Sequence, residues 1–444
     1  MLKNKYSILF TLRYFTVINN KVISIVGAGI SGLSCALKLA GSKLTKDYTL
    51  RIFEDGERIG GRAHSIKVDD FSIDLGAGRF SPALHPNVAQ LLNELKEEIE
   101  VFPFTKIVCP HPQHKGLKEI LAQLKLKIAS SHNESFFQFL CQHMGHEKSH
   151  AIINALGYDS LYLPQISPKI AYDIIEKHPE IQCFSENEGY EWFNLVDGFA
   201  ALAKSLYQQA AKSGVDFYFE HQLINFQTKS ANTLLEFAGS EQQEIWHNSA
   251  YTVLALPPTA MSSLNIDFPN SWSDFSYGSI PLFKGFIFFD HPWWKDYELE
   301  NKVTIVDNPL RKIYFKSDKY IFFYTDSAYA DFWLEETNKS EDEYINTVMG
   351  LIAKALNISI KELPRPISNK FKYWPSGVEF ALETSPDHPP VLSKYNGKVI
   401  ATSDAYTPHC GWMEGGIIAG RSAADHILKQ LEKSDVEKVA AEIN

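Results

Sequence analysis

The sequence predicts an α/β protein in which two structural domains are interleaved along the chain. Three patterns support this fold class. A strand, a glycine-rich turn and a helix follow one another from Lys21, helical segments fill the block from Asn87 to about His178, and alternating aromatic segments run from Asn270 to Trp374. With 444 residues, of which 45% are hydrophobic and 22% charged, the chain is long enough for more than one domain.

The first regular elements predict a βαβ unit. The run "KVISIV" from Lys21 is rich in β-branched residues, which is typical of a parallel strand buried on both faces. "ISGLSCALKLA" has helical spacing, and "YTLRIF" supplies the next strand. Further along, "GFAALAKSLYQQAAKSG" predicts a helix that ends at Gly214, and "AYTVLALPP" predicts a buried strand that stops at two prolines.

The middle of the chain changes in character. "PNVAQLLNELKEEI" and "ESFFQFLCQHM" predict helices of a helical insertion, and "VDFYFE", "QLINFQ" and "TLLEFA" predict short strands. "GFIFF", "RKIYF" and "KYIFFYTD" predict an antiparallel sheet. A capping box from Ser340 to Glu343 opens a helix after that sheet. "GKVIAT" and a helix from Gly415 to Leu431 return to the α/β pattern.

These elements predict domains that are discontinuous in sequence. The N-terminal stretch "YSILFTLRYFTVI" is interrupted by Arg13 and is too short to span a bilayer, so we expect an extension ahead of the domain rather than a membrane anchor. The predicted parts are the extension (1–20), a nucleotide-binding domain (21–86, 187–262 and 390–435), and a substrate domain with a helical part (87–186) and a sheet part (263–389).

Charge and cysteine content narrow the classes of partner. The formal net charge is -10 and the sequence pI is about 5.9, which argues against a nucleic-acid or anionic-membrane binder and favours a small-molecule partner. The sequence contains no G-x-S-x-G, HExxH or Walker A string and no metal-ligand cluster. The cysteines are scattered without a CxxC pair, so we expect a reducing cytoplasm; they are Cys35, Cys109, Cys141, Cys183 and Cys410.

The string "GAGISG" predicts a dinucleotide site. Gly27, Gly29 and Gly32 form the G-x-G-x-x-G pattern directly after a strand and at the start of a helix. Such a turn brings a pyrophosphate close to the helix N-terminus, where free N–H groups and the helix dipole favour an anion. Glu54 ends the second strand, where a carboxylate accepts hydrogen bonds from ribose hydroxyls. A purely structural glycine turn is the alternative.

A second glycine-rich turn decides between a nicotinamide and a flavin. "EDGERIGGRAHS" brings Gly60, Gly61 and Arg62 toward the same pyrophosphate, and Arg62 neutralises phosphate charge that one helix end cannot. Two phosphate-contacting loops favour FAD.

With these motifs the chain resembles the flavin amine oxidase family, which includes monoamine oxidases, L-amino-acid oxidases and polyamine oxidases. The resemblance covers nearly everything from Lys21 to Leu431, and its motifs are "GAGISG", Glu54, "ERIGGR", "LALPP" and "GWMEGGIIAG". It implies a Rossmann-type FAD-binding domain interleaved with a substrate domain of antiparallel sheet plus helical insertion. Monoamine oxidases attach their flavin through a cysteine, but Cys410 is not in the matching position, so FAD is expected to bind non-covalently.

Longer strings are similar to the branch of this family that oxidises L-tryptophan in bisindole pathways of the violacein type. They are "IDLGAGRFSP", "AYDIIEKHPEIQ", "LFKGF", "VDNPLRKIYFKSDKYIFFYTDS" and "SDAYTPHCGWMEGG". This resemblance implies oxidation of L-tryptophan by oxygen to the imine of indole-3-pyruvate, with release of hydrogen peroxide. The resemblance also suggests two partners: a second copy of the chain in a homodimer, and a downstream imine-coupling enzyme. The alternatives are an oxidase of another aromatic L-amino acid or an arylalkylamine, and a flavin-binding protein without turnover.

Lys284 interrupts the apolar string "IPLFKGFIFF". Strand alternation places it on one face with Leu282, Phe286 and Phe288, where a buried ammonium is costly unless it is paired or its pKa falls. A structural role requires a partner carboxylate. The resemblance instead assigns Lys284 to hold a water at the flavin N5 atom.

The resemblance assigns Arg79 and Tyr324 to the substrate carboxylate. The guanidinium fork of Arg79, in "GAGRF", suits a bidentate grip, and Tyr324 alternates with Phe322 on one strand face. An arginine paired with a structural aspartate and a plain core tyrosine are the alternatives.

The remaining site residues also come from the resemblance. Tyr158 and His178 are placed near the indole, although His178 has a helix-end alternative, and Trp412 is placed against the reactive face of the flavin. Tyr373 or Trp374 is a further candidate for the pocket wall, and Asp404 is directed toward the ribityl chain. The implied cofactor contacts are Gly27, Gly29, Ser31, Gly32, Glu54, Gly61, Arg62, Gly78, Arg79, Leu223, Asp404 and Met413.

Overall fold

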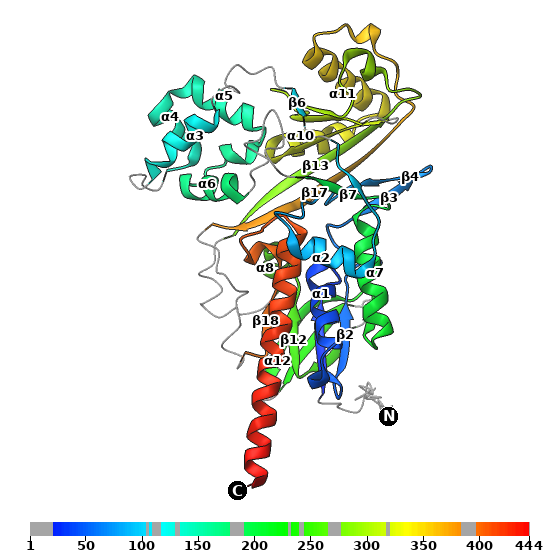
Figure 1. Ribbon diagram of the computed structural model, residues 1–444, viewed down its shortest axis with the longest axis vertical. Coiled ribbons are helices and arrows are strands. Elements are labelled where there is room, and N and C mark those ends of the chain that lie inside the picture. Colours follow the sequence, from blue (N-terminus) through cyan, green and yellow to red (C-terminus); the bar gives the residue numbers. More distant parts are fainter. Residues whose placement is uncertain are drawn as a thin grey trace, which may run out of the picture.

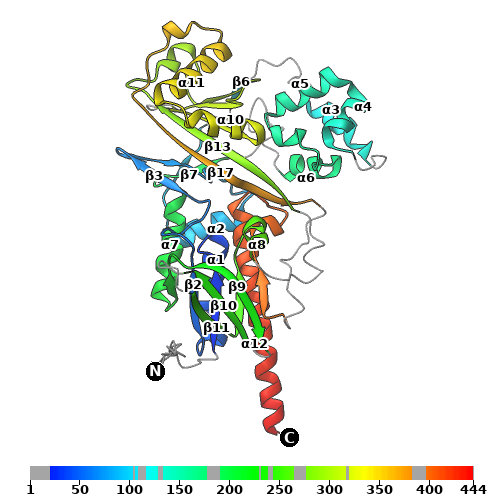
Figure 2. The same ribbon diagram turned by 180° about the vertical axis from the view of Figure 1, so that it is seen from behind.

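Two sheets organise the molecule, one in each domain. In the computed structural model, the domain with the parallel sheet lies at the bottom of Figure 1 and the antiparallel sheet crosses above it, with a group of helices to one side. Figure 2 shows the same arrangement from behind. The structure describes residues 21–103, 106–108, 117–128, 134–177, 191–229, 232–238, 244–264, 277–316, 320–382 and 397–443.

A parallel sheet forms the centre of the first domain. Every residue of its central strand β1 is buried, which explains why "VISIV" is apolar on both faces instead of alternating. Within the described ranges the sheet has five strands in the order β18-β12-β1-β2-β8, and all its pairings are parallel. The strands are β1 (Val22–Val26), β2 (Thr49–Phe53), β8 (Asp216–Tyr218), β12 (Tyr251–Leu254) and β18 (Val399–Ala401).

Helices cover one face of the parallel sheet and a small antiparallel sheet covers the other. A side chain at Gly420 would meet the carbonyl oxygen of Ser31 at 2.1 Å, so the last helix lies directly on the first. That last helix then runs on beyond the domain, at the bottom of Figure 1. The covering elements are α1 (Ile30–Ala40), α7 (Phe199–Lys212) and α12 (Met413–Ile443) on one side and β9 (Gln222–Lys229), β10 (Asn232–Ala238) and β11 (Glu244–Ser249) on the other.

The predicted antiparallel sheet is confirmed. The described residues form six strands in the order β17-β13-β16-β15-β14-β6, and only the β14–β6 pair is parallel. The strands are β6 (Lys106–Val108), β13 (Tyr277–Phe288), β14 (Lys302–Ile305), β15 (Lys312–Phe315), β16 (Tyr320–Asp326) and β17 (Ser368–Ala381).

The two faces of this sheet have different roles. One face, which carries Phe283 and Phe323, packs against helices α10 (Ser327–Thr337) and α11 (Glu341–Leu356) in a single apolar core. Helix α11 begins with the predicted capping box, in which the side chains of Ser340 and Glu343 satisfy backbone N–H groups. Because side chains alternate along a strand, Lys284 points to the opposite face, toward the parallel-sheet domain.

A helical lobe stands beside the antiparallel sheet. We define it as the helices α3 to α6 with the short helix η4 (Figure 1). Its core of Phe136, Phe139 and Ile152 continues onto Ile280 and Ile305 of the sheet, which fixes the position of η4 at the edge of the site. The elements are α3 (Leu117–Lys125), α4 (Phe136–Met144), α5 (His146–Leu156), η4 (Asp159–Tyr162) and α6 (Pro168–Lys177).

Three expectations about element limits were wrong. The helix predicted by "PNVAQLLNELKEEI" is α2 (Pro86–Leu95), which ends where Lys96 takes a left-handed conformation with φ of 58°. The following residues form β5 (Ile99–Val101), which pairs with β7 (Phe193–Leu195), and β6 also lies within the block expected to be helical. Pairing with distant strands overrides local helix preference there. The last helix extends past Leu431 to Ile443.

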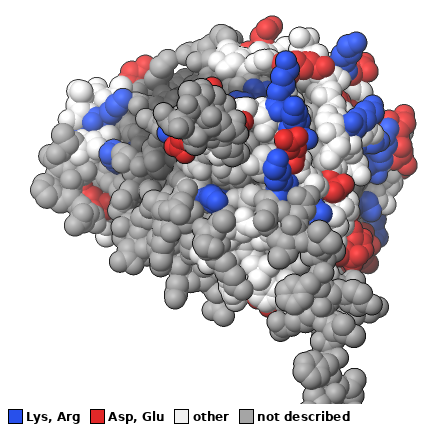
Figure 3. Space-filling view, turned by 90° about the horizontal axis from the view of Figure 1, so that it is seen from below, with Lys and Arg blue, Asp and Glu red and all other residues white. Residues whose placement is uncertain are grey.

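Short elements complete the described chain. They are β3 (Ser65–Val68), β4 (Phe71–Asp74), α8 (Pro258–Ser262), and the single turns η1 (Lys43–Thr45), η6 (Trp293–Tyr297), η7 (Ile360–Glu362) and η9 (Asp404–Tyr406). On the face seen from below, acidic and basic side chains are interspersed (Figure 3). In the described ranges, no helix is both long and apolar enough to cross a membrane.

Candidate active site

A cavity of about 670 Å³ is lined by both domains and by the helical lobe. Most of the predicted site residues line it. Gly32 lies outside the lining because it packs helix α1 onto the preceding turn, and His178 lies outside the described residues. The lining includes Gly27, Gly29, Ser31, Glu54, Gly61, Arg62, Gly78, Arg79, Tyr158, Leu223, Lys284, Tyr324, Asp404, Trp412 and Met413.

The first glycine turn leaves room beside the N-terminus of helix α1. A side chain built at Gly29 would meet no atom within 4 Å, whereas one at Gly32 would meet the carbonyl oxygen of Gly27 at 2.0 Å. Gly29 is the N-cap of α1, and no side chain caps the helix. The N–H groups of the first turn therefore face an open part of the cavity, which suits a phosphate.

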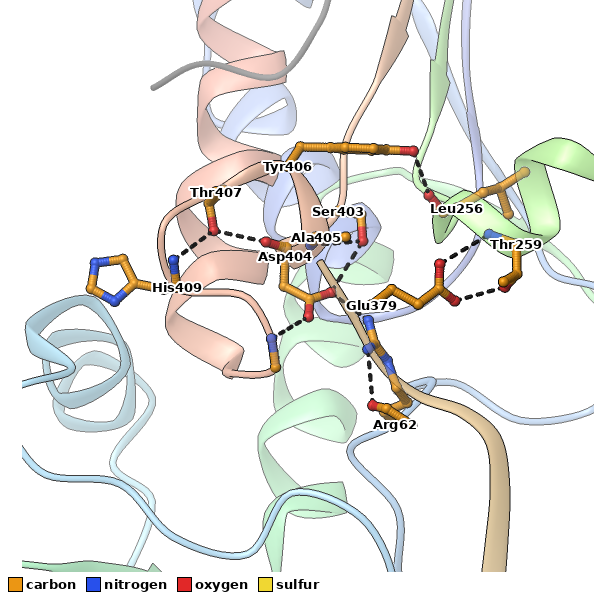
Figure 4. A network of polar contacts seen from close by, with 12 residues as sticks. Arg62, Leu256, Thr259, Glu379, Ser403, Asp404, Ala405, Tyr406, Thr407 and His409 are labelled. Atoms are coloured by element: carbon orange, nitrogen blue, oxygen red, sulfur yellow. Dashed lines mark hydrogen bonds and ion pairs between the residues drawn. The ribbon is translucent and has the colours of Figure 1, made fainter. Parts of the chain in front are cut away.

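The second glycine turn is held against the first. The N–H of Gly60 donates to the carbonyl oxygen of Ala28 at 2.8 Å, and Gly60 forms a bridge with Gly29. Arg62 follows this turn and pairs with Asp404, and its Nη1 donates to the carbonyl oxygen of Gly377 at 3.2 Å (Figure 4). The two residues that the resemblance assigned to different parts of the cofactor thus form one ion pair.

Asp404 is fixed by several donors. Its Oδ2 accepts from the N–H of Gly411 at 2.9 Å, and its Oδ1 accepts from the hydroxyl of Ser403 at 3.1 Å. Both bonds tie the carboxylate to the segment that leads into helix α12. Arg62, Asp404 and the start of α12 therefore form one rigid corner of the cavity.

Glu379 is a lining residue that the sequence did not identify. It is fully buried, and its carboxylate accepts from the N–H and the hydroxyl of Thr259 at 2.9 and 2.6 Å (Figure 4). Burial raises the pKa of this carboxyl group, and the hydrogen bonds from Thr259 oppose that shift. The partner Thr259 lies 120 positions away in the chain, which leaves no local signal.

Glu54 directly follows strand β2 and lines the cavity. Its Oε2 accepts from the N–H of Ala28 at 2.8 Å, and its Oε1 lies 3.3 Å from the N–H of Gly56. Burial, reinforced by a hydrogen bond with Asp55, raises the pKa of Glu54 to about 7. The carboxylate thus ties the first glycine turn to the end of β2.

Lys284 has backbone partners. Its ammonium donates to the carbonyl oxygens of Asp74 and Gly76 at 2.6 and 3.3 Å. A side chain at Gly78 would come within 3.1 Å of the lysine Nζ, so the glycine at this position leaves room for the lysine ammonium. Burial lowers the pKa of Lys284 to about 8; the Asp74 carboxylate opposes this shift and Arg79 adds to it.

This pKa predicts a pH-dependent stability difference between the wild type and Lys284→Met. Between pH 8 and 10.5 the unfolded chain still binds the lysine proton that the folded chain has lost, so the free energy of unfolding of the wild type should rise with pH relative to the variant. The expected relative rise is at most about 3 kcal/mol. Urea titrations of both proteins across this range measure it, and parallel pH curves would contradict the assigned pKa.

Strand register brings two lysines to the two sides of Tyr324. Lys284 on β13 pairs with Tyr324 on β16, which pairs in turn with Lys312 on β15. Cross-strand partners share a face, so all three belong to the cavity side of the sheet. The next row is aromatic: the rings of Phe322 and Tyr314 stack with centres 4.3 Å apart.

Arg79 lies among aromatic rings. Its guanidinium carbon is 4.7 Å from the ring centre of Trp192, 5.6 Å from that of Phe102 and 6.0 Å from that of Trp412. Trp412 stacks on His85 with ring centres 4.3 Å apart. These rings pack around the guanidinium and leave it only partly exposed, which strengthens its attraction for an anion.

The structure separates the two candidates for the further pocket wall. Trp374 lines the cavity, and its indole N–H donates to the carbonyl oxygen of Leu75 at 2.9 Å. Tyr373 points to the other face of the sheet, where its hydroxyl donates to Asp331 at 2.8 Å. The cavity also has a wall residue, Asp326, that the sequence did not identify, and Lys312 lies behind Tyr158 and Tyr324.

Sequence comparison gives two family matches. Residues 25–95 match the NAD(P)-binding Rossmann-like domain, and residues 124–428 match the flavin containing amine oxidoreductase family. An L-amino-acid oxidase of Demansia vestigiata is 19% identical over 94% of this chain and 88% of its own length. An L-amino-acid oxidase of Sistrurus catenatus edwardsii is 36% identical, and a 4,4'-diapophytoene desaturase of Staphylococcus haemolyticus is 30% identical, but these matches span only 15% and 24% of those proteins.

Solved structures show the same fold. Cyclohexylamine oxidase from Brevibacterium oxydans superposes with a TM-score of 0.72 at 16% identity, covering 93% of this chain and all of that chain. Putrescine oxidase superposes with a TM-score of 0.70 at 14% identity, covering 92% of this chain and 99% of the other. The predicted fold class is thereby confirmed, and a flavin is the cofactor that this family implies. Because the family match spans more than half of its length, the chain belongs to the flavin-containing amine oxidoreductases.

Proposed function

We propose that this protein is an FAD-dependent L-amino-acid oxidase that converts L-tryptophan to the imine of indole-3-pyruvate and releases hydrogen peroxide. The observation that carries the proposal is the arrangement around one cavity of three residues: Arg79, whose guanidinium lies among aromatic rings, the partly buried Tyr324, and Lys284. The reaction serves as the first step of a bisindole pathway of the violacein type. Its imine product is unstable in water, so an imine-coupling enzyme is the natural next partner.

The residues at the glycine turns fit FAD. The open space beside Gly29 and the uncapped N-terminus of α1 would receive the pyrophosphate, and Glu54 would receive the ribose hydroxyls. Arg62 would face the pyrophosphate, and its ion-pair partner Asp404 would face the ribityl chain. FAD, when bound, supplies the two-electron oxidation and passes the electrons to oxygen. Cys410 forms no covalent link in this proposal.

This assignment predicts the effect of Gly29→Val. The backbone of Gly29, with φ of -72° and ψ of 178°, is accessible to valine, so the fold should be kept. The new methyl groups occupy the space meant for the pyrophosphate, and the purified variant should be colourless. Gly41→Ala, at the C-cap of the same helix with φ of -76°, is the matched control and should stay yellow. A Gly29→Val protein with normal flavin content would contradict the placement of the cofactor.

Arg79 and Tyr324 hold the substrate carboxylate. The ring-lined setting of Arg79 strengthens a charge-assisted bond, and Arg79 also opposes the rise in the pKa of Tyr324 that burial causes. Burial keeps the Tyr324 hydroxyl protonated, so it is available as a hydrogen-bond donor. The carboxylate grip then orients the Cα hydrogen of the substrate.

Lys284 holds a water beside the reacting atoms. An ammonium has three N–H donors, and two of them are taken by the carbonyl oxygens of Asp74 and Gly76. The third would hold the water. A pKa of about 8 lets this lysine donate or accept a proton near neutral pH.

The aromatic lining supports a large flat substrate side chain. Phe286, Tyr314 and Phe322 form a continuous row on the sheet, and Tyr158 and Trp412 close the cavity from other elements. Such walls favour indole over aliphatic side chains. His178 completes the proposed substrate contacts. An arylalkylamine is the second candidate, since the structural neighbours act on amines and the same rings accept an aryl group.

The proposal is tested by following peroxide from the purified protein with L-tryptophan, L-phenylalanine, L-tyrosine and tryptamine. We expect L-tryptophan to be oxidised with the highest kcat/KM and tryptamine to be oxidised weakly, because Arg79 has no carboxylate to bind in the amine. No peroxide from L-tryptophan, or a higher kcat/KM for tryptamine, would overturn the assignment.

A further inference from the structure

Three consecutive residues of the helical lobe are each held by a charged residue of the antiparallel sheet. Lys312 lies with its Nζ 3.0 Å from the ring centre of Tyr158. The Nε of Arg311 lies 3.0 Å from Oδ2 of Asp159. The N–H of Ser160 donates to Oδ1 of Asp326 at 2.6 Å. The segment that carries two cavity-lining residues, Tyr158 and Ser160, is therefore fixed to the sheet at three successive positions.

Lys312 is buried without a hydrogen-bond partner. The residue is 5% exposed, and its Nζ has no such partner among the described residues. Its nearest ring is Tyr158, and the ring centre of Tyr324 lies 5.0 Å away. A side chain at Gly157 would meet the Cε of Lys312 at 3.1 Å, so this glycine leaves space for the lysine stem.

Lys312 lies among both acidic and basic groups. Burial lowers the pKa of Lys312 well below its usual value, although the carboxylates of Asp326 and Asp159 oppose that shift and favour the ammonium. Arg311 and Arg79 act in the same direction as burial. With no hydrogen bond from the described residues, the main contact left to a protonated Lys312 is the π face of Tyr158, and such a contact is attractive when it is desolvated.

We infer that Lys312 is a positioning residue that makes the site select electron-rich aromatic side chains. Tyr158 lines the cavity and its ring rests on the ammonium, which draws π density away from the ring. An electron-poor ring binds an electron-rich ring most strongly, and indole is the most electron-rich aromatic side chain of a natural amino acid. This inference rests on the proposed function, because it assumes that the substrate side chain stacks on Tyr158.

The test uses holoenzyme and the binding of indole-3-acetate, which has the ring and the carboxylate but no amine to oxidise. Isothermal calorimetry gives Kd for this acid and for its mono- and polyfluorinated forms, in which electron density falls step by step. For the wild type we expect Kd to rise by about three- to tenfold across the series. Lys312→Met keeps the length of the side chain and removes its charge. For this variant we expect a higher Kd for indole-3-acetate itself and almost no change of Kd with fluorination.

Controls separate charge from shape. Fluorine changes the size and apolarity of the ligand equally in every protein, so only the difference between the series reports on Lys312. Lys312→Arg keeps the charge, so Kd should again rise as the ligand is fluorinated. Tyr158→Leu keeps Lys312 but removes the ring, so Kd should change little along the ligand series. If Lys312→Met does not retain its fold, as shown by its melting temperature, Lys312→Gln, which also lacks the charge, takes its place in the comparison with the wild type.

The outcomes distinguish this inference from the proposed function. An equal rise of Kd with fluorination in the wild type, Lys312→Met and Tyr158→Leu would overturn the inference. Failure of the wild type to bind indole-3-acetate would also overturn it, even if L-tryptophan is oxidised. A protein that shows the expected slopes but forms no peroxide from L-tryptophan would retain the inference and lose the proposed reaction.

Discussion

Lys284→Met is expected to keep the flavin bound and to slow turnover by about 10²- to 10⁴-fold, the range that general acid–base groups contribute. Methionine has nearly the length of lysine, so the space beside Gly78 stays filled. The carbonyl oxygens of Asp74 and Gly76 lose their hydrogen-bond donor, and the proposed water loses the group that binds it. Oxygen uptake at saturating L-tryptophan measures the effect. The variant should also lose any limb of the pH–rate profile near pH 8.

Lys370→Met provides the matched control. This exposed lysine lies on β17, directly across from Phe286 and two residues along the strand from the partner of Lys284. It does not line the cavity, so its removal should leave oxygen uptake unchanged. Near-normal turnover of Lys284→Met would mean that Lys284 has only a structural role, in which it connects β13 to the loop after β4.

Arg79→Met should raise the KM for L-tryptophan by about 10²-fold or more while the protein stays yellow. Loss of one partner of a desolvated charge pair costs about 2 to 5 kcal/mol, and each 1.4 kcal/mol is a factor of ten. Methionine keeps contact with Trp192 and Phe102, so the walls of the site should hold. Steady-state kinetics and flavin absorbance measure the two effects.

Tryptamine separates a lost carboxylate grip from a damaged pocket. The amine has no carboxylate, so its kcat/KM should be similar in the wild type and Arg79→Met, and Arg79→Lys should recover part of the loss with L-tryptophan because a point charge remains. Equal loss with both substrates would show that Arg79 supports the pocket rather than the carboxylate.

Local patterns were sufficient for the elements around the cofactor. The apolar strand, the glycine turn and the helix of "VISIVGAGISG" are contiguous, so their fold is specified by residues that touch one another in sequence, and they form β1 and α1 as predicted. Lys284 was found because strand alternation is local as well: a charge in an apolar row of β13 needs an explanation, and the structure supplies carbonyl partners for it.

Lys312 shows the limit of the same reasoning. In "RKIYF" it breaks an apolar row in the way that Lys284 does, and the alternation signal was present. What makes it notable is its contact with Tyr158, which lies 154 positions earlier, directly before the short helix η4. Contacts at such distances follow from the docking of the helical lobe, and no local pattern specifies them.

Two further features of the fold could not be predicted for the same reason. The pairing of Arg62 with Asp404 joins residues 342 positions apart. The strand β5 pairs with β7 across almost a hundred positions, and its residues are exposed, so no buried periodic pattern marks them as a strand. Position in the final fold, rather than residue type, gives these groups their roles.

A single anaerobic mixing experiment shows whether this site oxidises an L-amino acid that it holds by its carboxylate. Purified protein is mixed with L-tryptophan, D-tryptophan or tryptamine without oxygen, and the loss of the yellow colour is followed in a stopped-flow instrument. We expect rapid bleaching with L-tryptophan, very slow bleaching with the other two, and return of the colour when oxygen is admitted. Faster bleaching with tryptamine, or none with L-tryptophan, would contradict it.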